Sequence, residues 1–79
     1  MRPSICELRS GENAVIRGVV GGLGFVRRLE AMGIRPGKSL TKLSAQFLGG
    51  PVTIVVDRRC VALGRGMAAR VMVEREIAS

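Results

Sequence analysis

The segment from Phe25 to Gly37 is the part of this 79-residue chain that most restricts its fold. Phe25, Leu29 and Met32 recur at helical spacing, so one face of a short helix can lie against a core. The pattern predicts a single amphipathic helix that runs from about Leu23 to Met32. No Ser, Thr, Asp or Asn is placed to cap its first turn, because the preceding residues are mostly glycine.

The end of this helix is marked by four residues. Gly33 can take the left-handed conformation that stops a helix, and Ile34 can then fold back on the last turn. Pro36 and Gly37 predict a tight turn, because proline fixes φ and glycine leaves it free. A helix stopped so sharply indicates that the chain changes direction and structure type at this point.

The rest of the chain is rich in β-branched and apolar residues, punctuated by glycine, proline and charged turns. These patterns predict a mainly β fold, a small five-stranded barrel with one principal short helix and a second short helical turn. We expect one domain over residues 1–79. Two apolar residues of a lead-in segment at residues 4–8, Ile5 and Leu8, are expected to seal one end of the barrel. The expected strands are residues 14–20, 39–47, 52–56, 60–63 and 71–73, with the helical turn at residues 64–69.

The composition excludes several classes of function. Histidine is absent and only two residues are aromatic, so there is little material for general-base catalysis or for stacking on nucleic-acid bases. No nucleophile–base pair can be assembled, and we expect no enzyme. The net charge of +7 is dispersed along the chain. It is typical either of a solvated surface or of an anionic partner, such as a phosphate backbone, a lipid headgroup layer or an acidic protein face.

Cysteine and carboxylate spacing gives no metal site. Cys6 and Cys60 lie far apart, no CxxC or CxxH spacing accompanies them, and we expect both thiols to be reduced and buried. The carboxylates do not cluster at helical spacing, so we expect no metal ligand set and no cofactor. No apolar run is long enough for a signal peptide or a membrane span, which favours a cytoplasmic protein.

The order of motifs resembles that of the ferrous iron transport protein A family, FeoA. The most specific stretch is Arg28-Leu29 followed by Met32-Gly33-Ile34 and Pro36-Gly37. Two departures are the hairpin residues 57–59, where the family often has glycine, and Gly64, where it often has a cation. The remaining matches are Leu8, Gly11, Ala14, Val15, Ile16, Gly49, Gly50, Pro51, Val52, Val61, Ala62, Leu63, Ala68, Val71 and Val73.

The resemblance implies an SH3-like barrel and a role in ferrous iron transport and metal ion homeostasis. It implies docking onto the cytoplasmic part of FeoB, the membrane GTPase transporter that accompanies such proteins, and hence a position at the inner face of the membrane through that partner. Self-association is left open. The residues assigned to the structural motif are Leu29, Gly33, Pro36, Gly37, Gly49, Gly50 and Pro51.

We expect the predicted helix to carry the partner-binding residues, because it is the element that interrupts the barrel. Leu23, Arg27, Arg28 and Met32 are the candidates. Two alternatives remain beside this transport role. One is an SH3-like metal-dependent regulator module, and the other is a small basic nucleic-acid-binding barrel, for which the missing aromatic residues leave no strong case.

Overall fold

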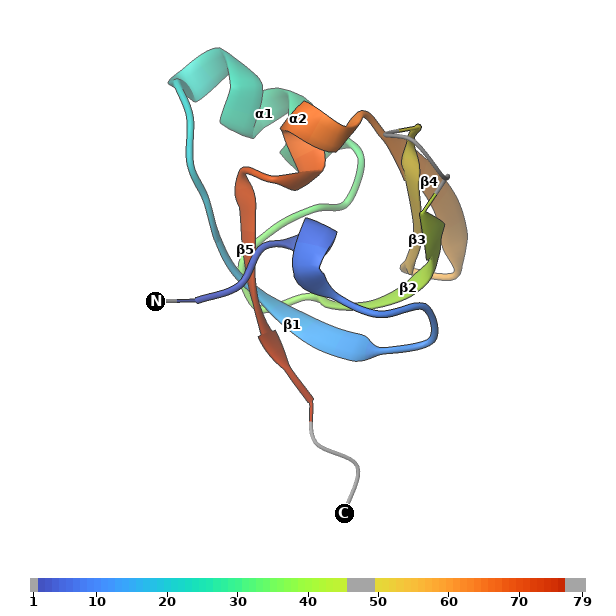
Figure 1. Cartoon of the computed structure of the whole chain (residues 1–79). Helices are drawn as coiled ribbons and strands as arrows, with labels where there is room; N and C mark the ends of the chain where they lie inside the picture. Colours follow the sequence, from blue (N-terminus) through green and yellow to red (C-terminus); the bar gives the residue numbers. More distant parts are fainter. Residues whose placement is uncertain (1, 46–49, 77–79) are drawn as a thin grey trace.

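The computed structural model describes residues 2–45 and 50–76, in which five strands form one antiparallel sheet (Figure 1). The strands lie in the order β4-β3-β2-β1-β5. The predicted mainly β fold, with one principal helix and a second short helical turn, is confirmed. The elements along the chain are the 3-10 helix η1 (Ile5–Glu7), β1 (Asn13–Val19), α1 (Leu23–Ala31), β2 (Ser39–Ala45), β3 (Val52–Val56), β4 (Arg59–Leu63), α2 (Arg65–Ala68) and β5 (Val71–Arg75).

Strand β1 lies between β2 and β5 in the curved sheet and pairs with both. Its first residues pair with β2, from Asn13 opposite Thr41 to Val15 opposite Ser39. The strand also pairs with β5, with a register irregularity between Ile16 and Gly18. Figure 1 shows β3 and β4 on one side of the curved sheet and β5 on the other, with α1 and α2 together at the top.

The core lies inside this curve and receives apolar side chains from every element. Strand β3 shows the pattern most clearly, because its alternate residues are buried while those between them are partly exposed. Such alternation places one face of a strand on a core. The expected sealing of one end by Ile5 and Leu8 is confirmed, because both side chains belong to the core. Its buried members are Ile5, Leu8, Ala14, Ile16, Leu29, Ile34, Leu40, Val52, Ile54, Val56, Leu63, Ala68, Val71 and Val73.

The end of α1 has the geometry that the sequence predicts. Gly33 has φ of +89°, and its N–H donates to the carbonyl of Glu30 at 3.0 Å. The N–H of Ile34 donates to the carbonyl of Leu29 at 2.9 Å, and both side chains are fully buried. These two bonds satisfy carbonyls that a helix end would otherwise leave free, and the apolar contact fixes the exit direction.

The predicted turn after α1 is also present. Gly37 has φ of +92°, and the N–H of Lys38 donates to the carbonyl of Arg35 at 3.1 Å, so Pro36 and Gly37 occupy the turn's central positions. The N–H of Gly37 then donates to the carbonyl of Ile16 at 2.7 Å. The turn is therefore joined to β1 and delivers the chain into β2.

Two features of the N-terminal region were not predicted. Ser4 and Glu7 form a capping box around η1: the Ser4 hydroxyl accepts from the N–H of Cys6, and the Glu7 carboxylate accepts from the N–H of Ser4. Lys42 is only 3% exposed. Its ammonium donates to the carbonyls of Ile5, Cys6 and Leu8, so β2 holds η1 against the end of the barrel.

Several expectations need correction or fall outside the described residues. The prediction that both cysteines are buried is wrong: Cys6 is partly exposed and Cys60 is exposed, because Cys60 lies on the outward face of the edge strand β4. The first strand ends at Val19 rather than at residue 20, and α1 ends at Ala31. The end of the strand expected at 39–47 and the motif residue Gly49 lie outside the described residues.

Candidate functional site

The outward face of α1 is the first candidate site. Successive residues of an α-helix are about 100° apart around its axis, so the buried Leu29 fixes which residues face away from the core. The residues that share this outward face, which we call the α1 face, are all exposed: Leu23, Gly24, Arg27, Arg28 and Ala31. Around the helix axis, the small residues Gly24 and Ala31 lie between Arg27 and Arg28. The two guanidinium groups are therefore accessible to a partner.

The four residues predicted to bind a partner do not all share this face. Leu23, Arg27 and Arg28 are exposed on it, and Leu23 is 65% exposed. Met32 is partly buried and packs against the core, on the flank of the helix opposite Leu23. Spacing alone assigns Met32 to the apolar stripe with Phe25 and Leu29, and that assignment fits the structure better than a role at the centre of a contact surface.

The ring of Phe25, in the first turn of α1, lies close to the backbone at Gly21. A Cβ atom at Gly21 would lie 2.6 Å from a ring carbon of Phe25, so a larger residue there would require the ring to shift. On the C-terminal side of the fold, the guanidinium carbon of Arg70 lies 5.5 Å from the centre of the same ring. This distance is typical of a cation–π contact. Arg70 therefore lies close to the start of α1, a position that sequence spacing does not predict.

Six of the seven residues assigned to the structural motif lie within the described part of the chain. Leu29 is fully buried, Gly33 is buried, and Pro36 and Gly37 are exposed at the turn. Gly50 and Pro51 lie directly before β3. Outside the turn, Pro51 is exposed and Gly50 is partly exposed.

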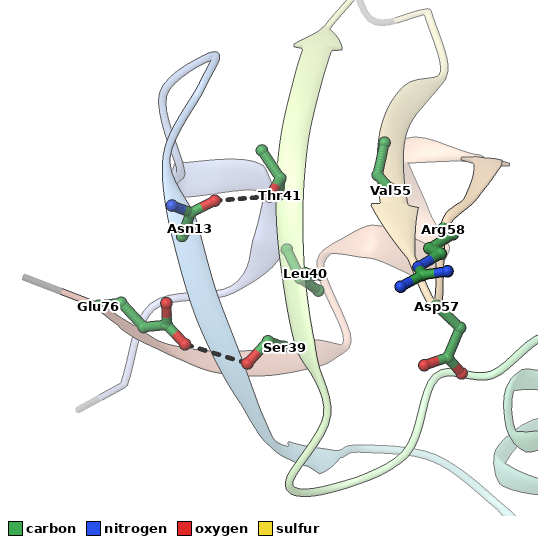
Figure 2. Close-up of a pocket in the computed structure, with 8 residues that line it drawn as sticks. All are labelled: Asn13, Ser39, Leu40, Thr41, Val55, Asp57, Arg58 and Glu76. Atoms are coloured by element: carbon green, nitrogen blue, oxygen red, sulfur yellow. Dashed lines mark hydrogen bonds between the residues drawn. The ribbon is translucent and has the colours of Figure 1, made fainter. Parts of the chain in front are cut away.

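A second candidate site is a hollow of about 210 Å³ on the outer face of the sheet (Figure 2). Two hydrogen bonds cross it: the Ser39 hydroxyl donates to Glu76 at 3.0 Å, and the Thr41 hydroxyl donates to Asn13 at 2.5 Å. No residue of α1 lines the hollow, so the two candidate sites are separate. The lining residues are Asn13, Ser39, Leu40, Thr41, Val55, Asp57, Arg58 and Glu76.

The charged groups of the hollow are largely paired with other protein groups. Asp57 accepts from the ammonium of Lys38 at 3.1 Å, and both side chains are roughly half exposed. Glu76 accepts from Ser39. Arg58 lies on the β3–β4 turn with φ of +63°. Oppositely charged groups partnered at an open surface offer weak selectivity for any one ligand charge, so the hollow is the weaker candidate.

One carboxyl group near the start of β1 has a shifted pKa. The backbone N–H of Arg9 donates to the Glu12 carboxylate at 2.6 Å and holds the pKa of Glu12 below its ordinary value. The nearby guanidinium of Arg75 acts in the same direction. Because a lowered pKa favours the charged form, Glu12 stabilises the fold above its ordinary pKa of 4.5, and this contribution is lost as acid protonates the folded form.

Within residues 2–45 and 50–76, no three His, Cys, Asp or Glu side chains gather closely enough to hold a metal ion. Cys6 and Cys60 are both free thiols there. Among the same residues, no helix is long and apolar enough to cross a membrane.

The curved five-stranded sheet, closed by short helices, places the chain in the class of small SH3-like domains. A crystal structure of an iron uptake regulatory protein, FeoA, superposes with a TM-score of 0.88 and 30% sequence identity, over 96% of this chain and 100% of that one. The FeoA domain model matches residues 4–75, and the chain belongs to the FeoA domain family. The resemblance inferred from the motifs is thereby confirmed.

Two further proteins, one found by sequence and one by structure, are similar to this chain. A protein of Methanocaldococcus jannaschii named "Putative Fe(2+) transport protein A" is 36% identical over 66 residues, which are 84% of this chain and 78% of that protein. A manganese-dependent transcriptional repressor, solved in complex with manganese, has a TM-score of 0.86 and 18% identity, over 95% of this chain and 37% of the repressor. At that identity the repressor shows a shared fold only.

Proposed function

We propose that this chain is a non-enzymatic accessory protein of ferrous iron uptake that docks onto the cytoplasmic part of a FeoB-type membrane transporter through the α1 face. Family membership and the names of the relatives support the transport role. The observation that supports docking is the α1 face itself: Leu23, Arg27 and Arg28 are exposed together, while the opposite side of the helix is used for packing.

The chemistry of the α1 face suits an acidic partner surface with an apolar spot. Arginine can form paired hydrogen bonds with carboxylates, and exposed charges of one sign increase the rate at which an oppositely charged partner associates. Leu23 adds an apolar side chain that gains free energy when a partner removes it from water. The iron would be cargo of the transporter, and the role of this chain would be regulatory.

Charge reversal on α1 tests the proposal. We expect Arg27→Glu with Arg28→Glu to leave the melting temperature nearly unchanged, because exposed charges contribute little to stability. Binding to the purified cytoplasmic domain of the cognate transporter, measured by calorimetry at several salt concentrations, should weaken by at least about tenfold at low salt. Its dependence on salt should flatten, because two attractive charges have been removed.

A matched control reverses the same number of charges elsewhere. Arg2→Glu with Arg58→Glu changes two exposed arginines that lie outside α1. This variant should retain most of the wild-type affinity. If the folded α1 variant binds as tightly as the wild type at low salt, or if both variants lose affinity equally, the α1 face is not the docking surface.

A further inference from the structure

The connection between β1 and α1 exposes two large aliphatic side chains on either side of a glycine pair. Val20 is 60% exposed and Leu23 is 65% exposed, and Gly21 and Gly22 lie between them. We call Val20–Leu23 the apolar tip. Leu43 on β2 is the other exposed large apolar residue of the described chain, at 44%. Figure 1 shows the start of α1 at the outer edge of the molecule.

The apolar tip is held in place at both ends. The N–H of Val20 donates to the carbonyl of Arg70 at 2.8 Å, which ties the tip to the residue before β5. The carbonyl of Gly22 accepts from the N–H of Val26 at 3.0 Å and so begins the helix. The Phe25 ring packs under Gly21. Exposure of Val20 and Leu23 is therefore a property of an ordered segment.

Positive charge surrounds the apolar tip. Arg27 lies one helical turn after Leu23 and Arg28 follows it, while Arg70 is brought beside the tip by its contact with Phe25. The sequence from Gly18 to Leu29 contains no acidic residue. Aliphatic side chains that project from a surface rimmed by arginine are the combination that binds the interface of an anionic bilayer.

We propose that the apolar tip is a membrane-contact site, in which Val20 and Leu23 enter the headgroup region of an anionic bilayer while Arg27, Arg28 and Arg70 contact lipid phosphates. An anionic bilayer is chosen as the occupant because two neighbouring exposed aliphatic side chains with three arginines around them match an apolar layer beneath anionic headgroups. This contact goes beyond the proposed docking, since it requires no transporter. It uses Leu23, Arg27 and Arg28, which the proposed docking also uses, so membrane contact and docking would be alternative states of this face.

Vesicle co-sedimentation tests the contact with the full chain. We expect binding to vesicles of phosphatidylglycerol and phosphatidylcholine, and none to pure phosphatidylcholine. Val20→Ser with Leu23→Ser should lower the partition coefficient at least about tenfold, because two apolar side chains are lost from the interface. Arg70→Gln should lower it roughly fivefold. The matched controls Leu43→Ser and Arg58→Gln, which change an exposed leucine and arginine away from the tip, should have much smaller effects.

A fluorescence reporter separates insertion from general electrostatic attraction. The chain contains no tryptophan, so Leu23→Trp and Leu43→Trp each introduce a single probe. On anionic vesicles, emission of the Leu23→Trp variant should shift to the blue and be quenched by brominated lipid, while emission of the Leu43→Trp variant should not change. The proposal is overturned by a failure to bind anionic vesicles at low salt, by equal responses of the two probes, or by binding that the serine pair leaves intact.

Discussion

At the scale of single residues, Lys42 is unusual because it is a buried lysine. Lysine is rarely buried unless its charge is matched. Here the ammonium has three donors and uses all three on the carbonyls of Ile5, Cys6 and Leu8, the shortest contact being 2.6 Å. The charge-assisted bonds offset the cost of burial and attach η1 to β2.

We predict that Lys42→Met lowers the free energy of unfolding by about 2–4 kcal/mol, because three carbonyls lose a charged donor at the end of the core. Chemical denaturation followed by circular dichroism measures this change. Lys38→Met is the matched control. Lys38 is exposed and pairs with Asp57, so its loss should cost less than about 1 kcal/mol. Equal effects of the two substitutions would contradict the structural role of Lys42.

Part of this residue-scale information is available from the sequence. Leu40 faces the core, and alternation along a strand places Lys42 on the same side, so its inward position can be predicted once Leu40 is assigned. Its three acceptors cannot be predicted, because they come from a segment that lies close only in the folded chain. The position of Arg70 beside Phe25 is hidden for the same reason.

At the scale of elements, α1 is largely predictable because its signals are local. The apolar stripe, the Gly33 stop and the following turn all lie within one short stretch of sequence, and each appears in the structure. Helix η1 also has a local signal, the capping box formed by Ser4 and Glu7. The curvature of the sheet cannot be predicted in this way, because β1 pairs with segments that are distant in sequence.

The stability of α1 should depend on its single fully buried side chain. We predict that Leu29→Ala lowers the free energy of unfolding by about 2–5 kcal/mol, the usual range for truncating a buried leucine. Leu23→Ala removes the same atoms from an exposed position and should change it by less than about 0.5 kcal/mol. Thermal and denaturant melts of both variants provide the measurement. A small effect at Leu29 would show that α1 is not anchored through this residue.

In the β3–β4 turn we expect a substitution to raise the free energy of unfolding, whereas the substitutions above lower it. Asp57 and Arg58 have φ of +51° and +63°, the left-handed region that a two-residue hairpin turn requires. Arginine is strained there, whereas glycine is not. We predict that Arg58→Gly raises the free energy of unfolding by about 1 kcal/mol. Arg58→Ala removes the side chain but keeps a Cβ, so its gain should be smaller, and equal gains would show that the side chain rather than the backbone is responsible.

At the scale of the whole molecule, the fold class was predictable and the functional surface was predictable only in part. Five strands, one helix and their order follow from punctuation by glycine and proline and from apolar patterning. Leu23, Arg27 and Arg28 were selected correctly as exposed residues of one helix. The sequence could not show that Val20 and Arg70 lie beside them, since that arrangement depends on how β1 and β5 meet.

The whole chain should have little affinity for the ion that its family is named for. Histidine is absent, and in the described residues the carboxylates and thiols do not gather into a group of three. We therefore predict no one-to-one binding of Fe²⁺ by the isolated chain in anaerobic calorimetry. A stoichiometric site of micromolar affinity or better would contradict this, and would require ligands from two chains or from a different arrangement of this one.

The position of β1 between β2 and β5 has a consequence for how the protein is made. A ribosome delivers β1 well before β5, so one edge of β1 stays open until β5 has been synthesised. An unpaired strand edge can pair with the wrong chain. Stable folding should therefore begin only after β5 has been synthesised. A nascent chain halted after β4 should remain sensitive to protease, whereas the finished chain should become resistant as one cooperative unit.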